Sequence, residues 1–315
     1  MSKVIEKRLK KEKKLSERIV IELKKNKYLY ILSIPIFLYF ILFKYLPMFG
    51  LVLAFKDYNI MKGVAASEWV GLKYFKEFFS SVYFTRTLLN TFIISLMDIV
   101  VGFPIPIIFA LLLNELRGKY FKKFVQTASY LPHFISMVVI CGMITDFFST
   151  NGLISTLISK LGGENMNYIG NSSYFRQIFV GTNIWQQLGW NSIIYIAALA
   201  GVDRDLYEAA AVDGAGRWRQ LIHITLPGIA GTIIIMLIMR LGQVLSVGYE
   251  KIILLMTTQT QDVADVIASY TYRAGIINQR YSYSIAVGMF QSVINVIILL
   301  TANTISKKVT ETSLF

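Results

Sequence analysis

The stretch Glu208-Ala209-Ala210-Ala211-Val212-Asp213-Gly214 decides the fold of this 315-residue chain, together with Ile224-Thr225-Leu226-Pro227, which follows after nine further residues. This polar region lies between two long apolar stretches, each long enough to cross a lipid bilayer. We therefore expect it to form a hinge at the membrane surface. Its three consecutive alanines favour a helix with little side-chain bulk, which another protein can approach closely. The sequence thus predicts a docking element.

Local signals in the hinge predict two short helices joined by a turn. Asp205 and Glu208 have the spacing of a capping box, so we expect the first helix to begin at Asp205. Gly214 can adopt the left-handed conformation that a sharp turn requires. A second short helix is expected over residues 218–223. Pro227 would then lie in the first turn of the next membrane helix, where its missing N–H costs nothing.

The composition is that of a polytopic membrane protein. Hydrophobic residues make up 55% of the chain and charged residues only 16%, whereas a soluble protein carries about a quarter charged residues. At about 1.5 Å per residue, an apolar helix of about 20 residues spans the ~30 Å hydrocarbon layer. Six stretches are long enough, over residues 28–51, 87–113, 124–148, 174–200, 225–248 and 284–305. We therefore predict an all-α protein with six transmembrane helices.

The distribution of the net charge of +13 predicts the orientation of the chain. If the chain begins in the cytosol, twenty Lys and Arg residues fall in cytosolic segments and nine in outer loops. This asymmetry obeys the positive-inside rule, so it accounts for the basic charge without a nucleic-acid partner. The expected parts are a basic cytosolic tail (1–27), a six-span domain (28–305) with a cytosolic loop (201–226), and a cytosolic C-terminal tail (306–315). The basic tail is either solvated or an amphipathic helix that lies on the inner leaflet or packs against a partner protein.

The hinge resembles the EAA loop in the permeases of bacterial type I ABC importers. That pattern is Glu-Ala-Ala, three residues, Gly, nine residues and Ile-x-Leu-Pro, and every position of it is filled here. The resemblance implies that the loop enters a cleft on an ATPase subunit and carries the movement of that subunit into the membrane. It assigns this coupling role to Glu208, Ala209, Ala210, Gly214, Ile224, Leu226 and Pro227.

The same resemblance implies a protein of the bacterial cytoplasmic membrane with several partners. These are a second, homologous permease, two copies of an ATPase and an extracellular solute-binding protein. Other stretches, among them residues 44–50 and 126–136, resemble permeases for complex carbohydrates, and this narrower resemblance covers most of residues 28–305. It implies that the substrate is an oligosaccharide derived from a polysaccharide. A permease for another solute, such as a peptide, and an ion-coupled secondary transporter are the alternatives.

The chain carries no motif for catalysis or for a cofactor. It lacks Gly-x-x-x-x-Gly-Lys-Ser/Thr, whose backbone and lysine hold nucleotide phosphates, so we expect a partner ATPase to bind ATP and Mg²⁺. The two histidines, His133 and His223, lie ninety residues apart and predict no metal site. We therefore expect a transport subunit without enzymatic activity or a cofactor of its own.

Polar residues inside the predicted spans are candidates for the substrate pathway. Asp98 and Arg240 lie at similar depths, so they either form an ion pair or leave Arg240 facing the substrate. Amides and aromatic rings suit the hydroxyl edges and apolar faces of sugars. The candidates share one face of the fourth span and a polar stripe at helical spacing on the fifth: Gln186 and Trp190, then Arg240, Gln243 and Ser246. The sequence does not identify the sugar, or show which of two permeases contacts it.

Two further features are expected to shape the membrane domain. Pro104 and Pro106 would break the hydrogen-bond ladder of the second span and create a kink. In the outer loop 249–283, Asp262 would cap a short helix and Gly275 would end it. The nearby tyrosines, at positions 270, 272, 281 and 283, either anchor the chain in the headgroup layer or belong to a surface that receives a solute-binding protein.

Overall fold

The computed structural model describes residues 20–22, 25–310 and 313–314, in two units, Met1–Leu53 and Ala54–Phe315. The first unit contains one helical run, made of α2 (Lys27–Phe40), the π-turn η1 (Ile41–Tyr45) and α3 (Leu46–Met48). The 3₁₀ segment η2 (Phe49–Phe55) leads from it into the second unit. The run Lys27–Phe55 is long and apolar enough to cross a membrane, as predicted. Most of the predicted basic tail lies outside the described residues.

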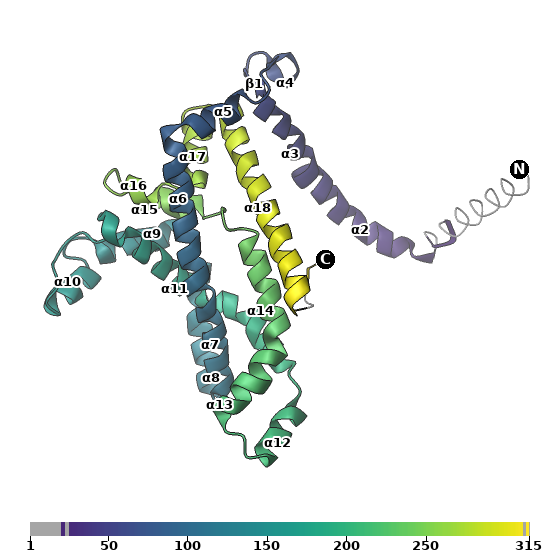
Figure 1. Cartoon of the computed structure of the whole chain (residues 1–315), viewed down its shortest axis with the longest axis vertical. Coiled ribbons are helices and arrows are strands. Elements are labelled where there is room, and N and C mark those ends of the chain that lie inside the picture. Colours follow the sequence, from purple (N-terminus) through teal and green to yellow (C-terminus); the bar gives the residue numbers. More distant parts are fainter. Residues whose placement is uncertain (1–19, 23–24, 311–312, 315) are drawn as a thin grey trace, which may run out of the picture. The chain divides into compact units, whose positions relative to one another are not determined.

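The second unit begins with a small hairpin and continues as helices (Figure 1). Strand β1 (Lys56–Asp57) pairs antiparallel with β2 (Glu68–Trp69), with α4 (Gly63–Ala66) between them. The helices up to the predicted fourth span are α5 (Lys73–Ser80), α6 (Val82–Met97), η3 (Asp98–Gly102), α7 (Pro104–Glu115), α8 (Lys119–Tyr130), η4 (Leu131–Phe134), α9 (Met137–Phe148), α10 (Leu153–Lys160) and α11 (Ser172–Ala200).

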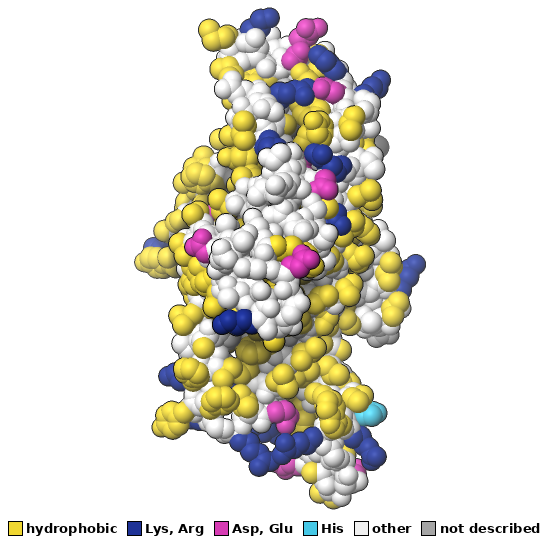
Figure 2. All heavy atoms as spheres, turned by 90° about the vertical axis from the view of Figure 1, so that its left-hand side faces the viewer, with side chains coloured by type: hydrophobic (Ala, Val, Ile, Leu, Met, Phe, Trp, Pro, Cys, Tyr) yellow, Lys and Arg dark blue, Asp and Glu magenta, His cyan; other side chains and the backbone are white. Residues whose placement is uncertain are grey.

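The remaining helices form the hinge and the last two predicted spans. They are α12 (Arg204–Val212), α13 (Arg217–Gln220), η5 (Leu221–Thr225), α14 (Leu226–Leu241), α15 (Tyr249–Leu255), α16 (Gln261–Ala264), α17 (Ile267–Tyr272), η6 (Arg273–Ile277) and α18 (Tyr281–Thr310). Figure 1 shows α12 and α13 at one end of this unit, and α5 and α17 at the other. On the face drawn in Figure 2, Lys and Arg side chains gather near the hinge end and again toward the opposite end, and many hydrophobic side chains lie between them.

Five helical runs in the described residues are long and apolar enough to span a membrane, namely Lys27–Phe55, Val82–Glu115, Met137–Lys160, Arg217–Leu241 and Tyr281–Thr310. The predicted fourth span corresponds to α11, a helix of 29 residues that is more polar. The predicted third span, 124–148, is wrong as one helix. The 3₁₀ turn that holds Pro132 separates α8 from α9, and the hydroxyl of Ser136 caps α9 by accepting from the N–H of Val139 at 3.4 Å.

π-Turns precede prolines in three of the apolar runs. Each turn ends two residues before a proline, so that η1, η3 and η5 precede Pro47, Pro104 and Pro227. A proline cannot donate a backbone hydrogen bond and its ring crowds the preceding turn, which a wider π-turn accommodates. The predicted break at Pro104 and Pro106 therefore takes the form of η3, within one 34-residue helical run.

Helix α11 is the central element of the second unit. It packs against α7, α8, α14 and α16. Gly189 lets it approach α8 closely, because a Cβ at this position would lie 2.3 Å from the carbonyl oxygen of Ser129. Many apolar side chains on the other described spans remain exposed, which is expected when lipid or another subunit covers them.

Candidate functional site

The hinge between α11 and α14 is a helical hairpin whose first arm is α12. The carboxylate of Asp203 caps this helix by accepting from the backbone N–H of Asp205 at 3.0 Å. The predicted capping box is therefore wrong, because the helix begins at Arg204 and Glu208 lies in its second turn. Glu208 and Ala209 are exposed on this arm, and Ala210 is half-buried.

Gly214 ends the first arm in the conformation that the sequence predicts. Its φ of +71° lies in the left-handed region. The N–H of Gly214 donates to the carbonyl of Ala211 at 3.1 Å, and that of Ala215 donates to Ala210 at 2.8 Å, which is the Schellman arrangement. A Cβ on Gly214 would meet no atom of the described residues within 4 Å. The preference for glycine here comes from the backbone conformation and not from crowding.

The second arm of the hinge is continuous with a membrane helix. Pro227 is the second residue of α14, as predicted, but α13, η5 and α14 form one run, Arg217–Leu241. The predicted short helix over 218–223 therefore does not stop before the membrane. The hydroxyl groups of Tyr207 and Thr225 are hydrogen-bonded at 2.9 Å and join the two arms. The hinge and the membrane helix are thus parts of one continuous helical run.

The hinge presents apolar side chains beside its exposed carboxylate. Leu206, Val212 and Trp218 are 53%, 88% and 77% exposed, whereas Ile224 and Leu226 are half-buried. Apolar side chains of this kind mark a protein-binding surface where they form a contiguous patch. The sequence pattern did not single out the three exposed residues, because their exposure follows from the hairpin and not from their spacing.

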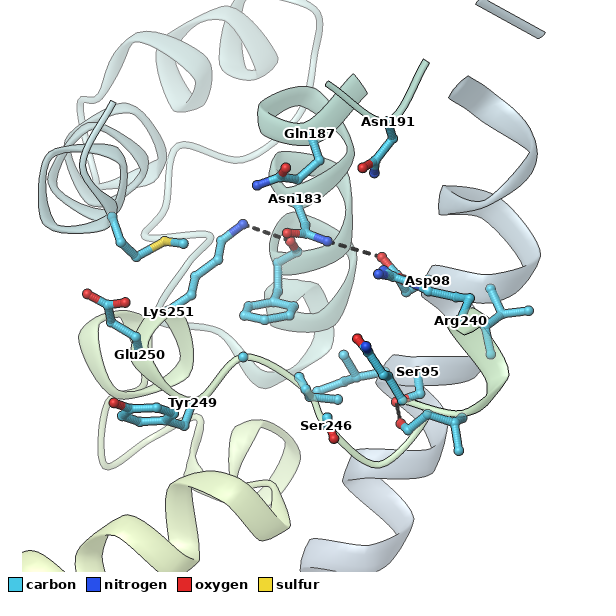
Figure 3. Close-up of a pocket in the computed structure, with 18 residues that line it drawn as sticks. Ser95, Asp98, Asn183, Gln187, Asn191, Arg240, Ser246, Tyr249, Glu250 and Lys251 are labelled. Atoms are coloured by element: carbon cyan, nitrogen blue, oxygen red, sulfur yellow. Dashed lines mark hydrogen bonds and ion pairs between the residues drawn. The ribbon is translucent and has the colours of Figure 1, made fainter. Parts of the chain in front are cut away.

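A cavity of about 380 Å³ lies where α6, α11, the end of α14 and the following segment meet (Figure 3). This is within the ordinary range for small-molecule sites, about 300–1,000 Å³. Its polar lining consists of Ser95, Asp98, Asn183, Gln187, Asn191, Arg240, Gln243, Ser246, Glu250 and Lys251. Apolar groups such as Phe179 and Val247 complete the wall. The mixture suits a ligand with hydroxyl groups and apolar faces.

Asp98 and Arg240 form an ion pair at the wall of this cavity. The amide of Asn183 donates to the other carboxylate oxygen of Asp98 at 3.1 Å. A second cavity of about 180 Å³ shares six lining residues with the first, namely Asp98, Asn183, Gln187, Asn191, Arg240 and Gln243. The predicted ion pair is therefore confirmed, and Arg240 also lines both cavities. Its contact with the substrate stays a prediction.

The predicted polar stripe on the fifth span does not lie on one continuous helix. Helix α14 ends at Leu241, and residues 242–248 form turns and an irregular segment. Side chains from other helices satisfy its backbone, as a membrane interior requires. Ser95 donates to the carbonyl of Val244, Gln291 donates to that of Leu245 at 2.7 Å, and Asn295 accepts from the N–H of Leu245 at 3.1 Å. Arg240, Gln243 and Ser246 nevertheless line the same cavity.

Gln186 and Trp190 do not line this cavity. Gln186 is buried. Trp190 stacks on the ring of His133, with 4.3 Å between centroids, and His133 in turn is hydrogen-bonded to Gln187 at 2.9 Å. The face of α11 that lines the cavity carries Asn183, Gln187 and Asn191, whose i, i+4, i+8 spacing was the available signal. A role of Gln186 or Trp190 in transport stays a prediction.

Lys251 is a charged cavity residue that sequence reasoning missed, as it missed Ser95 and Glu250. It lies on α15, in the segment between the last two spans, and its side chain is buried. Its ammonium donates to the carbonyl of Phe179 at 3.2 Å and to the hydroxyl of Thr182 at 2.9 Å. Burial lowers the pKa of Lys251 to about 8. No local motif marks this lysine, since its partners lie about 70 residues away in the sequence.

The outer loop is fixed around a second buried charge, Asp265. This carboxylate is fully buried and accepts from Arg273 at 2.5 Å and from Ser269 at 2.7 Å. Asp262 is not the predicted helix cap, because α16 begins at Gln261, and Gly275 lies inside η6 instead of ending a helix. Of the predicted tyrosine anchors, Tyr283 is buried and hydrogen-bonded to Tyr270 at 2.8 Å. These two rings therefore belong to the packing of the loop.

Comparison with known proteins places this geometry in a family. Residues 102–311 match the family described as the inner membrane component of binding-protein-dependent transport systems. Protein LplB of Bacillus subtilis (strain 168) is 46% identical over 294 residues, which is 93% of this chain and 92% of that protein. The polygalacturonan/rhamnogalacturonan transport system permease protein YteP of the same organism is 43% identical over 307 residues, or 97% of this chain and 95% of that protein.

Solved structures agree with this placement. A chain of a bacterial ABC transporter involved in the import of the acidic polysaccharide alginate superposes with a TM-score of 0.85 and 39% sequence identity. The match covers 93% of this chain and 99% of the other. The same transporter has been solved in complex with a periplasmic protein that holds an alginate pentasaccharide, and that match also has a TM-score of 0.85.

Proposed function

The chain belongs to the family of inner membrane components of binding-protein-dependent transport systems, and from this premise we propose that it is the permease subunit of an ATP-driven importer for oligosaccharides derived from polysaccharides. The observation that carries the proposal is the 43% identity, over 97% of the chain, to a permease named for polygalacturonan and rhamnogalacturonan transport. The alginate importer supports the same substrate class. The cavity, with its amides, ion pair and apolar wall, has the chemistry to receive a sugar.

The proposed assembly contains a second, homologous permease, two copies of an ATPase and an extracellular solute-binding protein, in a bacterial cytoplasmic membrane. We assign ATP and Mg²⁺ to the ATPase, because this chain has no phosphate-binding loop. The hinge would lie on the cytosolic side, with both termini. The exposed carboxylate of Glu208 and the apolar side chains beside it would contact the ATPase.

In the proposed coupling, closure of the ATPases displaces the hinge. The run Arg217–Leu241 then moves with it, because Gly214 fixes the turn and the Tyr207–Thr225 hydrogen bond holds the arms together. Arg240 lies at the far end of this run and is paired with Asp98 on another helix. Movement of the run would therefore reshape both cavities and expose the substrate to each side of the membrane in turn.

The experiment is reconstitution of the whole complex in proteoliposomes. We expect uptake of labelled trigalacturonate or of a neutral oligosaccharide to require both ATP inside the vesicles and the loaded solute-binding protein outside. Uptake of oligopeptides only would favour the alternative solute. Uptake driven by an ion gradient without ATP would refute the proposal in favour of a secondary transporter.

A further inference from the structure

Lys251 is a buried cation at the wall of the cavity. Its side chain is only 2% exposed. Among the residues that the structure describes, its hydrogen-bond acceptors are neutral, the carbonyl of Phe179 and the hydroxyl of Thr182. The ammonium also lies 4.9 Å from the centroid of the Phe179 ring. None of these contacts supplies an opposite charge. Burying such a charge without an opposite charge is costly, and an anion in the cavity would reduce that cost.

The cavity's own carboxylates do not neutralise Lys251. Asp98 is held by Arg240 and by Asn183. Glu250 is exposed, and no ion pair joins it to Lys251 in the described part of the chain. Figure 3 shows the Lys251 side chain directed toward α11, the helix that carries Asn183 and Gln187. The residue that carries the unneutralised positive charge and the two amide residues therefore line one cavity.

We infer that Lys251 is the residue by which this cavity recognises acidic sugars, with its ammonium receiving the carboxylate of a uronic acid unit. The inference rests on the proposed function, since it takes the cavity to hold an oligosaccharide. Asn183 uses its N–H group on Asp98 and keeps its carbonyl oxygen, while Gln187 uses its oxygen on His133 and keeps its N–H group. These two groups are placed to accept from and donate to the hydroxyls of the same sugar.

The chemistry predicts discrimination by charge. A carboxylate forms a charge-assisted hydrogen bond with an ammonium, whereas its methyl ester offers only a neutral acceptor. Trigalacturonate and its fully methyl-esterified form are therefore a matched pair of probes. We expect the assembled complex, solubilised without the solute-binding protein, to bind the acid at least roughly tenfold more tightly than the ester.

The test compares variants of Lys251 in this binding assay. Lys251→Met removes the charge at similar size and should remove the preference for the acid, while Lys251→Arg keeps the charge and should retain it. Lys160→Met is the matched control, because Lys160 is exposed on α10 and does not line the cavity. It should behave as the parent protein does. Thermal melting of each complex checks that the variants are folded.

The outcomes separate this inference from the proposed function. If the parent complex binds acid and ester equally, or binds neither, Lys251 is not an acid-recognising residue. If Lys251→Met weakens both ligands by the same factor, the lysine only ties α15 to α11 and the inference is overturned. In each case, ATP-dependent uptake of oligosaccharides by the parent protein would leave the proposed function standing. Absence of oligosaccharide uptake would refute that function instead.

Discussion

Removing the guanidinium of Arg240 tests the ion pair that joins the end of α14 to Asp98 in η3. Arg240→Ala would leave the carboxylate of Asp98, which is 14% exposed, with Asn183 as its remaining hydrogen-bond donor among the described residues. Breaking a fully buried pair in this way costs about 3–5 kcal/mol, because a charge is left uncompensated. The Arg240 side chain is 42% exposed in this chain, so water can screen part of the interaction. We therefore expect a loss of about 2 kcal/mol.

A second substitution, at Asp98, distinguishes two roles of Arg240: partner in an ion pair, or contact of the substrate only. Asp98→Asn in the Arg240→Ala background removes the stranded charge, and the new amide can still accept from Asn183. We expect the double variant to recover most of the lost stability. The single Arg240→Ala change should lower the melting temperature of the purified complex by at most about 4–8 °C, by the scaling for domains of 150–250 residues.

Melting and transport are measured on the same preparations. Recovery of stability without recovery of uptake would show that Arg240 both pairs with Asp98 and acts in the pathway, as its place on the cavity wall implies. Recovery of both would confine Arg240 to the ion pair and remove it from the pathway. An Arg240→Ala complex as stable as the parent would refute the reasoning, because a stranded carboxylate must cost stability.

Three further predictions follow from the backbone and the charge distribution. Because Gly214 has a φ of +71°, Gly214→Asn should retain transport, while Gly214→Val should abolish transport without preventing membrane insertion. Normal uptake by the Gly214→Val complex would contradict the coupling model. Gly189→Ala should reduce the yield of assembled complex, since its Cβ would lie 2.3 Å from the Ser129 carbonyl oxygen, whereas Gly181→Ala on the same helix, where nothing lies within 4 Å, should not. In a Cys141→Ala background, Met61→Cys should react with impermeant thiol reagents in intact cells and Lys119→Cys only in broken cells; the reverse pattern would invert the topology.

The hinge was predictable because its information is local. A turn glycine, a proline near a helix start and an alanine-rich helix each depend on a few neighbouring residues. The left-handed Gly214 and the position of Pro227 agree with these signals. The helix start did not, because Asp203 and Asp205 are both able to cap and only the folded backbone selects between them. Where two nearby residues can cap a helix equally well, the sequence alone does not fix the residue at which the helix begins.

The cavity was harder to predict because the residues that build it are far apart. The fourth span carries amides on two adjoining faces, and periodicity alone could not show that Asn183 and Gln187, and not Gln186, face the cavity. Lys251 acquires its partners only when the loop after α14 packs against α11. Asp265 likewise gains Arg86 of α6, in addition to Arg273 and Ser269 of its own loop. The Asp98–Arg240 pair was the exception, since the cost of charge within a membrane restricts the possible partners of each residue.

The irregular backbone near both ends of the run Arg217–Leu241 indicates where this helix can bend. A π-turn, η5, lies near its hinge end, and the irregular segment 242–248 follows its other end, while the helix between them is regular. Changes in backbone dihedral angles are most easily absorbed where the helical ladder is already interrupted. The regular part can then move as a unit. Asp98 lies in another π-turn, η3, and pairs with Arg240. The ion pair therefore joins the end of α14 to an interrupted turn of another helix. In the proposed coupling, we therefore expect movement at the hinge to have its largest effect at the wall of the cavity.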